Sequence, residues 1–441
     1  MKNRFFKYVS QNILAMIGLS LYILADTYFI SKAVGANGIT ALNMALPVYG
    51  VIFALGQMVG VGSAIRYSIV KEQYRNSNKD GSNECDKYFS GALFWGLVIG
   101  VIFAVLGLLF PDKIVEIMGG DETIVAIGVP YFRIFMSFSP FFIFNYTCNA
   151  FVRNDGNPSV SMAATLISSL FNIVFDYILM FPLGMGMPGA ALATALSPVV
   201  GVMICMIHFL SKKNTVKFKW FKTSLTRLFH CCQVGMSAFV GEMSGAVIVM
   251  VFNFIILRLT GNIGVAAYGV VANTALVAVA VFNGVALGSQ PLISESYGKH
   301  NIKDIKLIEK LGVATALGLA VIIVIMIWVF TDTIVGVFNS QGSDRLLSLA
   351  RVGLRIYFIG FLFAGINIFC SSALSAIASV KWAFVLSILK GFVVVNVCAA
   401  ILAPIFGMNG VWVAFPLSEF ILLIISGFAM KKSIGALESE R

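Results

Sequence analysis

Residues 153–197, RNDGNPSVSMAATLISSLFNIVFDYILMFPLGMGMPGAALATALS, contain two long apolar runs separated by a Gly/Pro turn, with an acid inside the first run. The acid is Asp176, and Asn172 lies four residues earlier, so both side chains project from one face of a helix. Thr194 adds another oxygen in the second run. An ionisable side chain within a membrane span is costly and rare, which predicts a functional site around Asp176.

The composition of the chain excludes a water-soluble protein. Hydrophobic residues make up 59% and charged residues 12% of the 441 positions, and the mean hydropathy is +0.92. Apolar runs of about 20 residues recur along the chain, as in membrane helices. The seven cysteines lie mostly inside these runs without a CxxC pair, so we expect buried apolar residues and no disulfide or metal framework.

We expect an all-α integral membrane protein with twelve transmembrane helices. The apolar runs place them at approximately 9–31, 44–69, 88–110, 127–150, 159–182, 188–210, 231–258, 267–293, 308–330, 350–373, 382–404 and 409–430.

Basic residues gather on every second loop, which predicts that both termini are cytoplasmic. This placement explains the net charge of +11 by membrane topology, so we expect no nucleic-acid partner. The residues are Lys2, Arg4 and Lys7 at the amino terminus, then Lys71, Arg75, Lys79 and Lys87, then Lys212, Lys213, Lys217, Lys219, Lys222 and Arg227, then Lys299, Lys303, Lys306 and Lys310, and finally Lys431, Lys432 and Arg441.

The two halves of the chain repeat one another. VGANGITAL at 34–42 aligns with TGNIGVAAY at 260–268, and GMPGAALAT at 186–194 aligns with GMNGVWVAF at 407–415. Two repeats of six spans must have the same orientation, so we expect two six-helix bundles related by a pseudo-twofold axis along the membrane normal. The predicted lobes are 1–215, which carries the cation site, and 227–441, joined by a cytoplasmic linker at 216–226.

The acids are not repeated. Asp26 in the first span aligns with Phe252, whereas Asn172 and Asp176 align with approximately Val394 and Cys398. At about 1.5 Å per residue, Asp26, Asp176 and Thr194 would all lie roughly 8–9 Å below the outer surface. Tyr131 enters the same leaflet. The sequence therefore predicts a pocket in the outer half of the first lobe only.

The chain resembles the multidrug and toxic compound extrusion (MATE) family, prokaryotic type. The resemblance rests on the two six-span repeats, on ADTYFISKAVG at 25–35 and on the stretch quoted first. It implies a cation or proton site made of Asp26, Asn172, Asp176 and Thr194, with Tyr131 beside it. The same four residues would bind Na⁺ if the protein is sodium-coupled. The structural alternatives are a group of polar contacts that holds the helices together and, for Tyr131, an aromatic residue at the membrane interface.

The resemblance also implies a coupling or substrate-binding role for Glu242 in span 7. Lys390, the only lysine deep in a span, is a possible partner or substrate contact. The alternatives are a neutral hydrogen-bonded acid and a lysine that snorkels to the interface. Unlike some members of the family, this chain has no proline in span 1 and no acid in span 10.

The resemblance implies a secondary antiporter that exports organic cations or other amphipathic drugs in exchange for Na⁺ or H⁺, without a cofactor. An alternative is a lipid-linked oligosaccharide flippase of the same superfamily, although Lys390 is the only obvious cation for a pyrophosphate. A membrane enzyme is disfavoured because the three histidines are scattered. We expect a monomer in the inner membrane of a prokaryote, with drugs and membrane lipid as partners.

Overall fold

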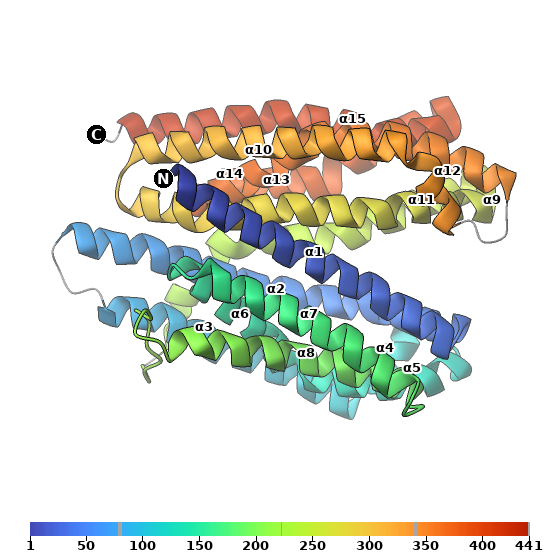
Figure 1. Ribbon diagram of the computed structural model, residues 1–441, viewed down its shortest axis with the longest axis horizontal. Coiled ribbons are helices and arrows are strands. Elements are labelled where there is room, and N and C mark those ends of the chain that lie inside the picture. Colours follow the sequence, from blue (N-terminus) through green and yellow to red (C-terminus); the bar gives the residue numbers. More distant parts are fainter. Residues whose placement is uncertain (78–81, 222, 339–342, 440–441) are drawn as a thin grey trace. The chain divides into compact units, whose positions relative to one another are not determined.

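The computed structural model describes residues 1–77, 82–221, 223–338 and 343–439, which are helical with short connections (Figure 1). Lys79, Lys222 and Arg441, three of the basic residues counted above, lie outside these ranges. The helices are α1 (Lys2–Ala33), α2 (Ala36–Asn76), α3 (Ser82–Leu109), α4 (Pro111–Ile117), α5 (Glu122–Ser137), α6 (Ser139–Asn154), α7 (Pro158–Met180), α8 (Gly186–Phe209), α9 (Leu225–Gly298), α10 (Ile302–Val329), α11 (Thr331–Phe338), α12 (Asp344–Tyr357), the 3₁₀ turn η1 (Phe358–Gly360), α13 (Phe361–Ala376), α14 (Val380–Ile388), the π-helical turn η2 (Leu389–Val393) and α15 (Val394–Ser439).

These helices make the twelve predicted spans. Within the described ranges, nine helical segments are long and apolar enough to cross a membrane, and α5 with α6, bent by 46°, makes a tenth. Two of the segments are double, because the backbone of α9 breaks at Gly261 and that of α15 breaks at Gly407. Dividing each segment at its glycine gives twelve spans, so the predicted all-α fold is confirmed.

The sequence repeat reappears in the backbone. Gly35 and Gly261, which are 226 positions apart as in the sequence alignment, have φ of 80° and 68°. Gly186 and Gly407, equivalent in the second alignment, have φ of 56° and 58°. A side chain disfavours such left-handed conformations, whereas glycine adopts them readily. Each half therefore uses glycine at the same two turns between antiparallel spans.

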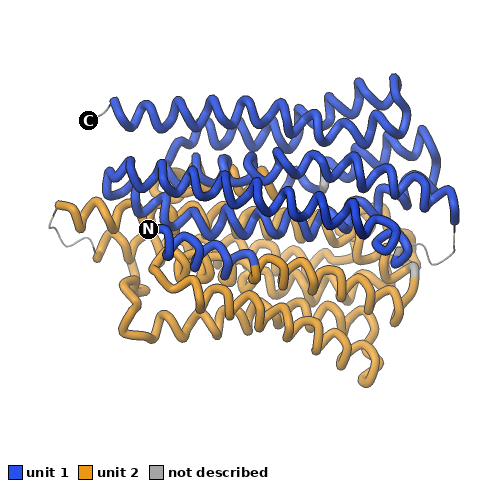
Figure 2. The backbone as a smooth tube through the Cα atoms, turned by 45° about the horizontal axis from the view of Figure 1, so that its top comes forward, with its two compact units in different colours: residues 1–13, 243–441 blue, residues 14–242 orange. Residues whose placement is uncertain are grey.

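The chain forms two compact units, Leu14–Glu242 and Met1–Ile13 with Met243–Arg441 (Figure 2). This division differs from the repeat boundary at 216–226. Residues 1–13, which begin the first span, belong to the unit of the second half, and the start of α9 up to Glu242 belongs to the unit of the first half. The start of α1 packs in a core with the end of α9 and with α10, α13 and α15, which includes Phe5, Val9 and Leu292. The start of α9, with Val234, belongs to the first unit. The predicted lobes 1–215 and 227–441 describe the repeats and stay a prediction.

Glycines allow both exchanged segments to approach their new neighbours closely. A Cβ built on Gly62 would lie 2.1 Å from the carbonyl oxygen of Cys231. A Cβ on Gly288, the repeat counterpart of Gly62, would lie 2.7 Å from the Cα of Val9. Real Cβ atoms cannot come so near to backbone, so glycine is required on α2 and on α9 where the exchanged segments cross.

Candidate functional site

Two acids are buried within the unit Leu14–Glu242. Asp26 on α1 is 7% exposed and Asp176 on α7 is fully buried. Oδ1 of Asp26 and both carboxyl oxygens of Asp176 have no hydrogen-bond partner among the described residues. The two carboxyl groups lie near enough to share a hydrogen bond if one of them is protonated. Two neighbouring carboxylates in an apolar surrounding repel one another, and a proton or a cation between them would relieve this repulsion.

Asn172 and Thr194, two further residues of the predicted site, are buried and contact one another. α7 and α8 pack side by side, and the Asn172 side-chain nitrogen donates a hydrogen bond of 3.2 Å to Thr194 Oγ1. This bond leaves the Asn172 amide oxygen without a donor among the described residues. Carboxylate, amide and hydroxyl oxygens are the ligands that hard cations prefer.

Tyr131 is fully buried on α5, but its hydroxyl group is already engaged. It shares a hydrogen bond of 3.0 Å with the hydroxyl of Tyr49 on α2. The Tyr49 ring stacks on Phe135 at 3.6 Å between centroids. Tyr131 lies within electrostatic range of Asp26, so it borders the acids as part of an aromatic wall. Tyr49, which the sequence analysis missed, carries no periodic or motif signal.

Glu242 lies on α9 at the end of the same unit. Its Oε1 accepts a hydrogen bond of 2.6 Å from the amide of Gln57 on α2, and its side chain is exposed. The Tyr22 ring on α1 lies within electrostatic range of Asp26, Asp176 and Glu242. Tyr22 is therefore near the buried acids and near Glu242.

Lys390 belongs to the other unit, in the π-helical turn η2. It makes no ion pair with any described residue, and Glu419 on α15 is the acid within electrostatic range. Glu419 is 3% exposed and accepts a hydrogen bond of 2.7 Å from Asn367 on α13, and Asn367 in turn accepts one of 2.8 Å from Ser426. The sequence analysis missed this buried polar cluster, because its members lie far apart in the chain.

The repeat counterparts of the four oxygen-bearing residues are apolar. Asp26 and Thr194 correspond to Phe252 and Phe415 by the alignments above, and Asn172 and Asp176 correspond to approximately Val394 and Cys398. All four counterparts belong to or pack against one hydrophobic core of the second unit. Phe415 stacks on Tyr357 at 4.1 Å between centroids. In the second half, apolar side chains therefore occupy the positions that carry oxygen-bearing side chains in the first half.

No group of three or more His, Cys, Asp or Glu side chains that could hold a metal ion occurs in the described ranges. Asp26 and Asp176, with Asn172 and Thr194, offer only oxygen ligands and none of the nitrogen or sulfur ligands that most transition-metal sites use. Such a set matches the chemistry of Na⁺ or of a bound proton, and no described residue group suggests a resident metal cofactor.

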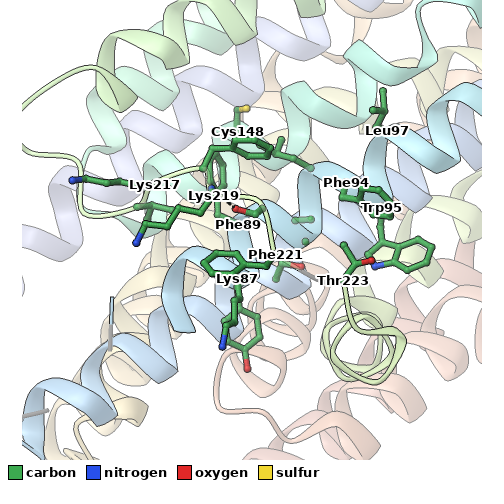
Figure 3. A pocket seen from close by; sticks show the side chains of 18 of the residues that line it. Lys87, Phe89, Phe94, Trp95, Leu97, Cys148, Lys217, Lys219, Phe221 and Thr223 are labelled. Carbon is green, nitrogen blue, oxygen red and sulfur yellow. Dashed lines mark hydrogen bonds between the residues drawn. The ribbon is translucent and has the colours of Figure 1, made fainter. Parts of the chain in front are cut away.

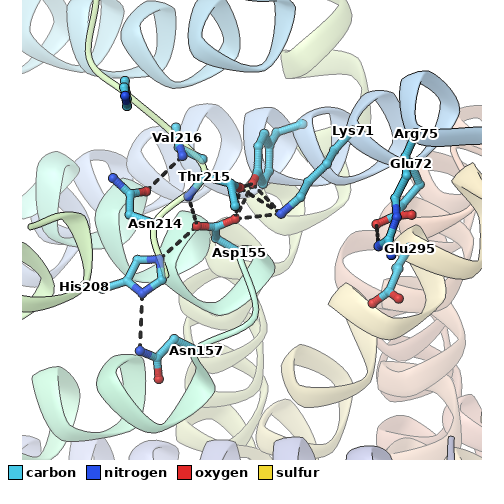
Figure 4. A network of polar contacts seen from close by, with 12 residues as sticks. Lys71, Glu72, Arg75, Asp155, Asn157, His208, Asn214, Thr215, Val216 and Glu295 are labelled. Carbon is cyan, nitrogen blue, oxygen red and sulfur yellow. Dashed lines mark hydrogen bonds and ion pairs between the residues drawn. The ribbon is translucent and has the colours of Figure 1, made fainter. Parts of the chain in front are cut away.

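Another buried acid, Asp155, organises the segment after α8 (Figure 4). Its carboxylate accepts hydrogen bonds from Tyr67 at 2.5 Å and Lys71 at 2.7 Å on α2, from His208 on α8 at 2.9 Å, and from the backbone N–H and the hydroxyl of Thr215. Burial by itself raises the pKa of this carboxyl, but the donors, His208 and Lys71 foremost, outweigh it and hold the pKa well below its usual range. The polar contacts therefore fasten residue 215 to α2, α6 and α8.

Comparisons with known proteins agree with the fold and the repeat. The profile of the MatE family matches residues 12–178 and again residues 238–405. The multidrug export protein MepA of Staphylococcus aureus (strain bovine RF122 / ET3-1) is 27% identical over 418 residues, which cover 92% of this chain and 88% of MepA. MepA of Staphylococcus saprophyticus is 24% identical and covers 89% of this chain and 85% of its own.

Solved structures with the same fold are also similar. An outward-facing multidrug resistance MATE family transporter of the MOP superfamily superposes with a TM-score of 0.92 at 22% identity, over 99% of this chain and 96% of that one. A MOP superfamily transporter from Pyrococcus furiosus, described as having a binding pocket of reverse polarity, superposes with a TM-score of 0.89 at 22% identity, over 98% and 96% of the two chains.

Proposed function

We propose, since the chain belongs to the MatE family of membrane transporters and is not an enzyme, that it is a secondary active multidrug efflux antiporter. It exports organic cations or other amphipathic drugs in exchange for Na⁺ or H⁺. The relatives named as multidrug export proteins support the cargo. The observation that carries the coupling is the pair of buried carboxyl groups, Asp26 and Asp176, whose oxygens lack protein donors among the described residues.

The coupling ion would act by neutralising this pair. With both carboxyls charged and no ion bound, the low-dielectric surrounding makes the site unstable. Binding of Na⁺, or protonation of one acid, relieves the repulsion, and Asn172 and Thr194 offer further oxygens. A state that brings Asp26 and Asp176 together is therefore favoured by the ion, and a state that separates them is not. Such a difference in affinity is all that alternating access requires.

Dye efflux from proteoliposomes tests the coupling. Purified protein is reconstituted with ethidium inside, and an inward Na⁺ gradient is imposed first at equal pH. An inward proton gradient then follows without Na⁺. We expect one of the two gradients to accelerate efflux over protein-free liposomes, which names the ion. Efflux that responds to neither gradient would refute antiport. Where Asp26 or Asp176 is replaced by Asn in the same assay, Asp112→Asn, which neutralises an exposed acid on α4, is the control.

Glu242 is proposed to couple drug binding to the ion, and Lys390 to contact substrate or partner groups. Glu242→Gln keeps a side-chain oxygen for the hydrogen bond from Gln57, so the helices α2 and α9 should stay paired. We expect this variant, and Lys390→Gln, to bind ethidium more weakly or to transport it with less dependence on the gradient. A variant with normal ethidium affinity and normal gradient dependence has no such role.

The chain is a multi-pass membrane protein, and its staphylococcal relatives support a bacterial cell membrane. We propose that both termini face the cytoplasm, that the drug is the small-molecule partner and that the chain works as a monomer. No observation favours the flippase alternative. Among the described residues Lys390 is the only lysine deep within the spans, and Glu419 is the acid within its electrostatic range.

A further inference from the structure

A cavity of about 680 Å³ lies within the unit Leu14–Glu242, apart from Asp26 and Asp176 (Figure 3). It is enclosed by the start of α3, the end of α8 and the segment that connects α8 to α9. Its volume is within the range of small-molecule sites, about 300–1,000 Å³. The walls are mostly apolar and include Phe89, Phe94, Leu97, Cys148, Val202 and Met206.

Basic side chains lie at one end of this cavity (Figure 3). Lys87, Lys217, Lys219 and Arg227 contribute to its lining. Two acids lie among them: Glu84 pairs with Lys87 at 2.5 Å and with Arg227 at 3.2 Å, and Asp86 pairs with Lys219 at 2.7 Å. The Lys217 ammonium makes no ion pair with any described residue. Four cations against two acids leave an excess of two positive charges at this end.

The other end of the cavity continues into the surface that faces lipid. Phe94 and Leu97 on α3 are 37% and 44% exposed, and Met206 on α8 is 43% exposed. Lys87 precedes Leu97 by ten residues, so the positive end and the apolar end are about 15 Å apart along α3. A positive group near the membrane surface, followed by an apolar channel directed into the membrane, is complementary to a phospholipid.

We infer that this cavity is a site for an anionic glycerophospholipid of the leaflet on the side of the α8–α9 connection. One acyl chain lies between Phe94, Leu97 and Met206, and the phosphate lies against Lys217, Lys219 and Arg227. The positive rim repels organic cations, which distinguishes this site from one for such drugs. A bound lipid would brace the connection between α8 and α9 against α3. This inference goes beyond the proposed antiport and does not depend on it.

Native mass spectrometry of the full-length protein in detergent tests the head group. Phosphatidylglycerol and phosphatidylcholine with identical acyl chains are titrated separately. We expect phosphatidylglycerol to bind more tightly, and Lys217→Gln to weaken it about fivefold, as one lysine contributes to an anionic lipid surface. Lys213→Gln, an exposed lysine on the same segment that does not line the cavity, is the matched control. Equal affinity for the two lipids, or equal loss in both variants, overturns the assignment.

A second pair of variants tests the cavity itself. A Cβ on Gly91, which lines it, would meet no atom within 4 Å, so Gly91→Leu fills the cavity without a backbone clash. Gly318→Leu on α10 also starts from open space and serves as the control. We expect only Gly91→Leu to lose the tight phosphatidylglycerol. Retention of the tight phosphatidylglycerol in Gly91→Leu, or its loss in Gly318→Leu as well, overturns the inference.

Discussion

Buried carboxylates are held in two opposite ways in this chain. Asp155 is surrounded by donors, with hydrogen bonds from Tyr67, Lys71, His208 and Thr215. The described part of the chain offers no donor to Oδ1 of Asp26 or to either carboxyl oxygen of Asp176. A saturated acid stabilises the fold as a permanent anion, whereas an unsaturated pair changes its energy when a proton or cation arrives. The first arrangement suits a structural role and the second suits an exchangeable ion.

The Asp155 network predicts a pH dependence of stability. The pKa of Asp155 is lowered in the folded protein, whereas an unfolded aspartate titrates near pH 3.9. The carboxylate therefore contributes its full stabilisation above about pH 5, and this is lost as the pH falls toward the folded pKa. We expect Asp155→Asn to lower stability at pH 7 by about 3 kcal/mol, since it breaks a buried ion pair.

Thermal unfolding in detergent between pH 7 and pH 3 measures this difference. The gap in unfolding temperature between the unaltered protein and Asp155→Asn should be widest at pH 7 and should shrink toward pH 3. Asp112→Asn, which removes an exposed acid, should unfold like the unaltered protein throughout. A gap that does not depend on pH would mean that Asp155 is not the titrating group.

Asn172 and Asp176 could be predicted from sequence because their signal is local: an acid in an apolar run and a helical spacing of four. Asp155 lies in the same quoted stretch, yet its role was missed. Its partners Lys71 and His208 are 84 and 53 residues away and come from other helices. Such contacts depend on how the helices pack together, and the periodicity of the sequence does not predict which distant residues meet.

At the scale of elements, the exchanged ends of α1 and α9 depend on small residues. α2 carries Gly62 where the α9 segment crosses it, and α9 carries Gly288 where the α1 segment crosses it. A Cβ built on Gly235 of α9 would lie 2.0 Å from the carbonyl oxygen of Met58 on α2, so this crossing also requires glycine. Between helices in lipid no hydrophobic effect drives association. Close approach at small residues instead stabilises the helix pair by van der Waals packing.

We expect Gly62→Ala and Gly288→Ala each to destabilise the protein by about 1–3 kcal/mol, because the added methyl group forces the crossing helices apart. Matched controls lie on the same helices: a Cβ on Gly50 of α2 or Gly269 of α9 would meet no atom within 4 Å. Thermal unfolding should show a loss only for the first pair. Since alanine favours a helix more than glycine does, an equal loss in Gly50→Ala and Gly62→Ala would mean that the close crossing is not the cause.

At the scale of the molecule, the fold is doubled and the acids are not. The span count, the repeat and the lack of a second set of acids follow from hydropathy and alignment, which act along the chain. The exchange of Met1–Ile13 and of the first part of α9 between units did not follow, because which unit a helix end joins depends on packing at crossings. The four oxygen-bearing positions are polar in one copy and apolar in the other, which confines the proposed ion site to one half.

This asymmetry predicts unequal effects at repeat-equivalent positions. Asp176→Asn should reduce gradient-driven ethidium efflux by about 5- to 150-fold, the usual span of a coupling between two sites. The fold should persist, because the variant removes a buried charge. Cys398→Ser, at approximately the equivalent position in the apolar core of the second unit, should leave the gradient dependence intact even if it lowers stability. Both variants are compared at equal protein in proteoliposomes. Full efflux in Asp176→Asn, or loss of gradient dependence in folded Cys398→Ser, would contradict an ion site confined to the first half.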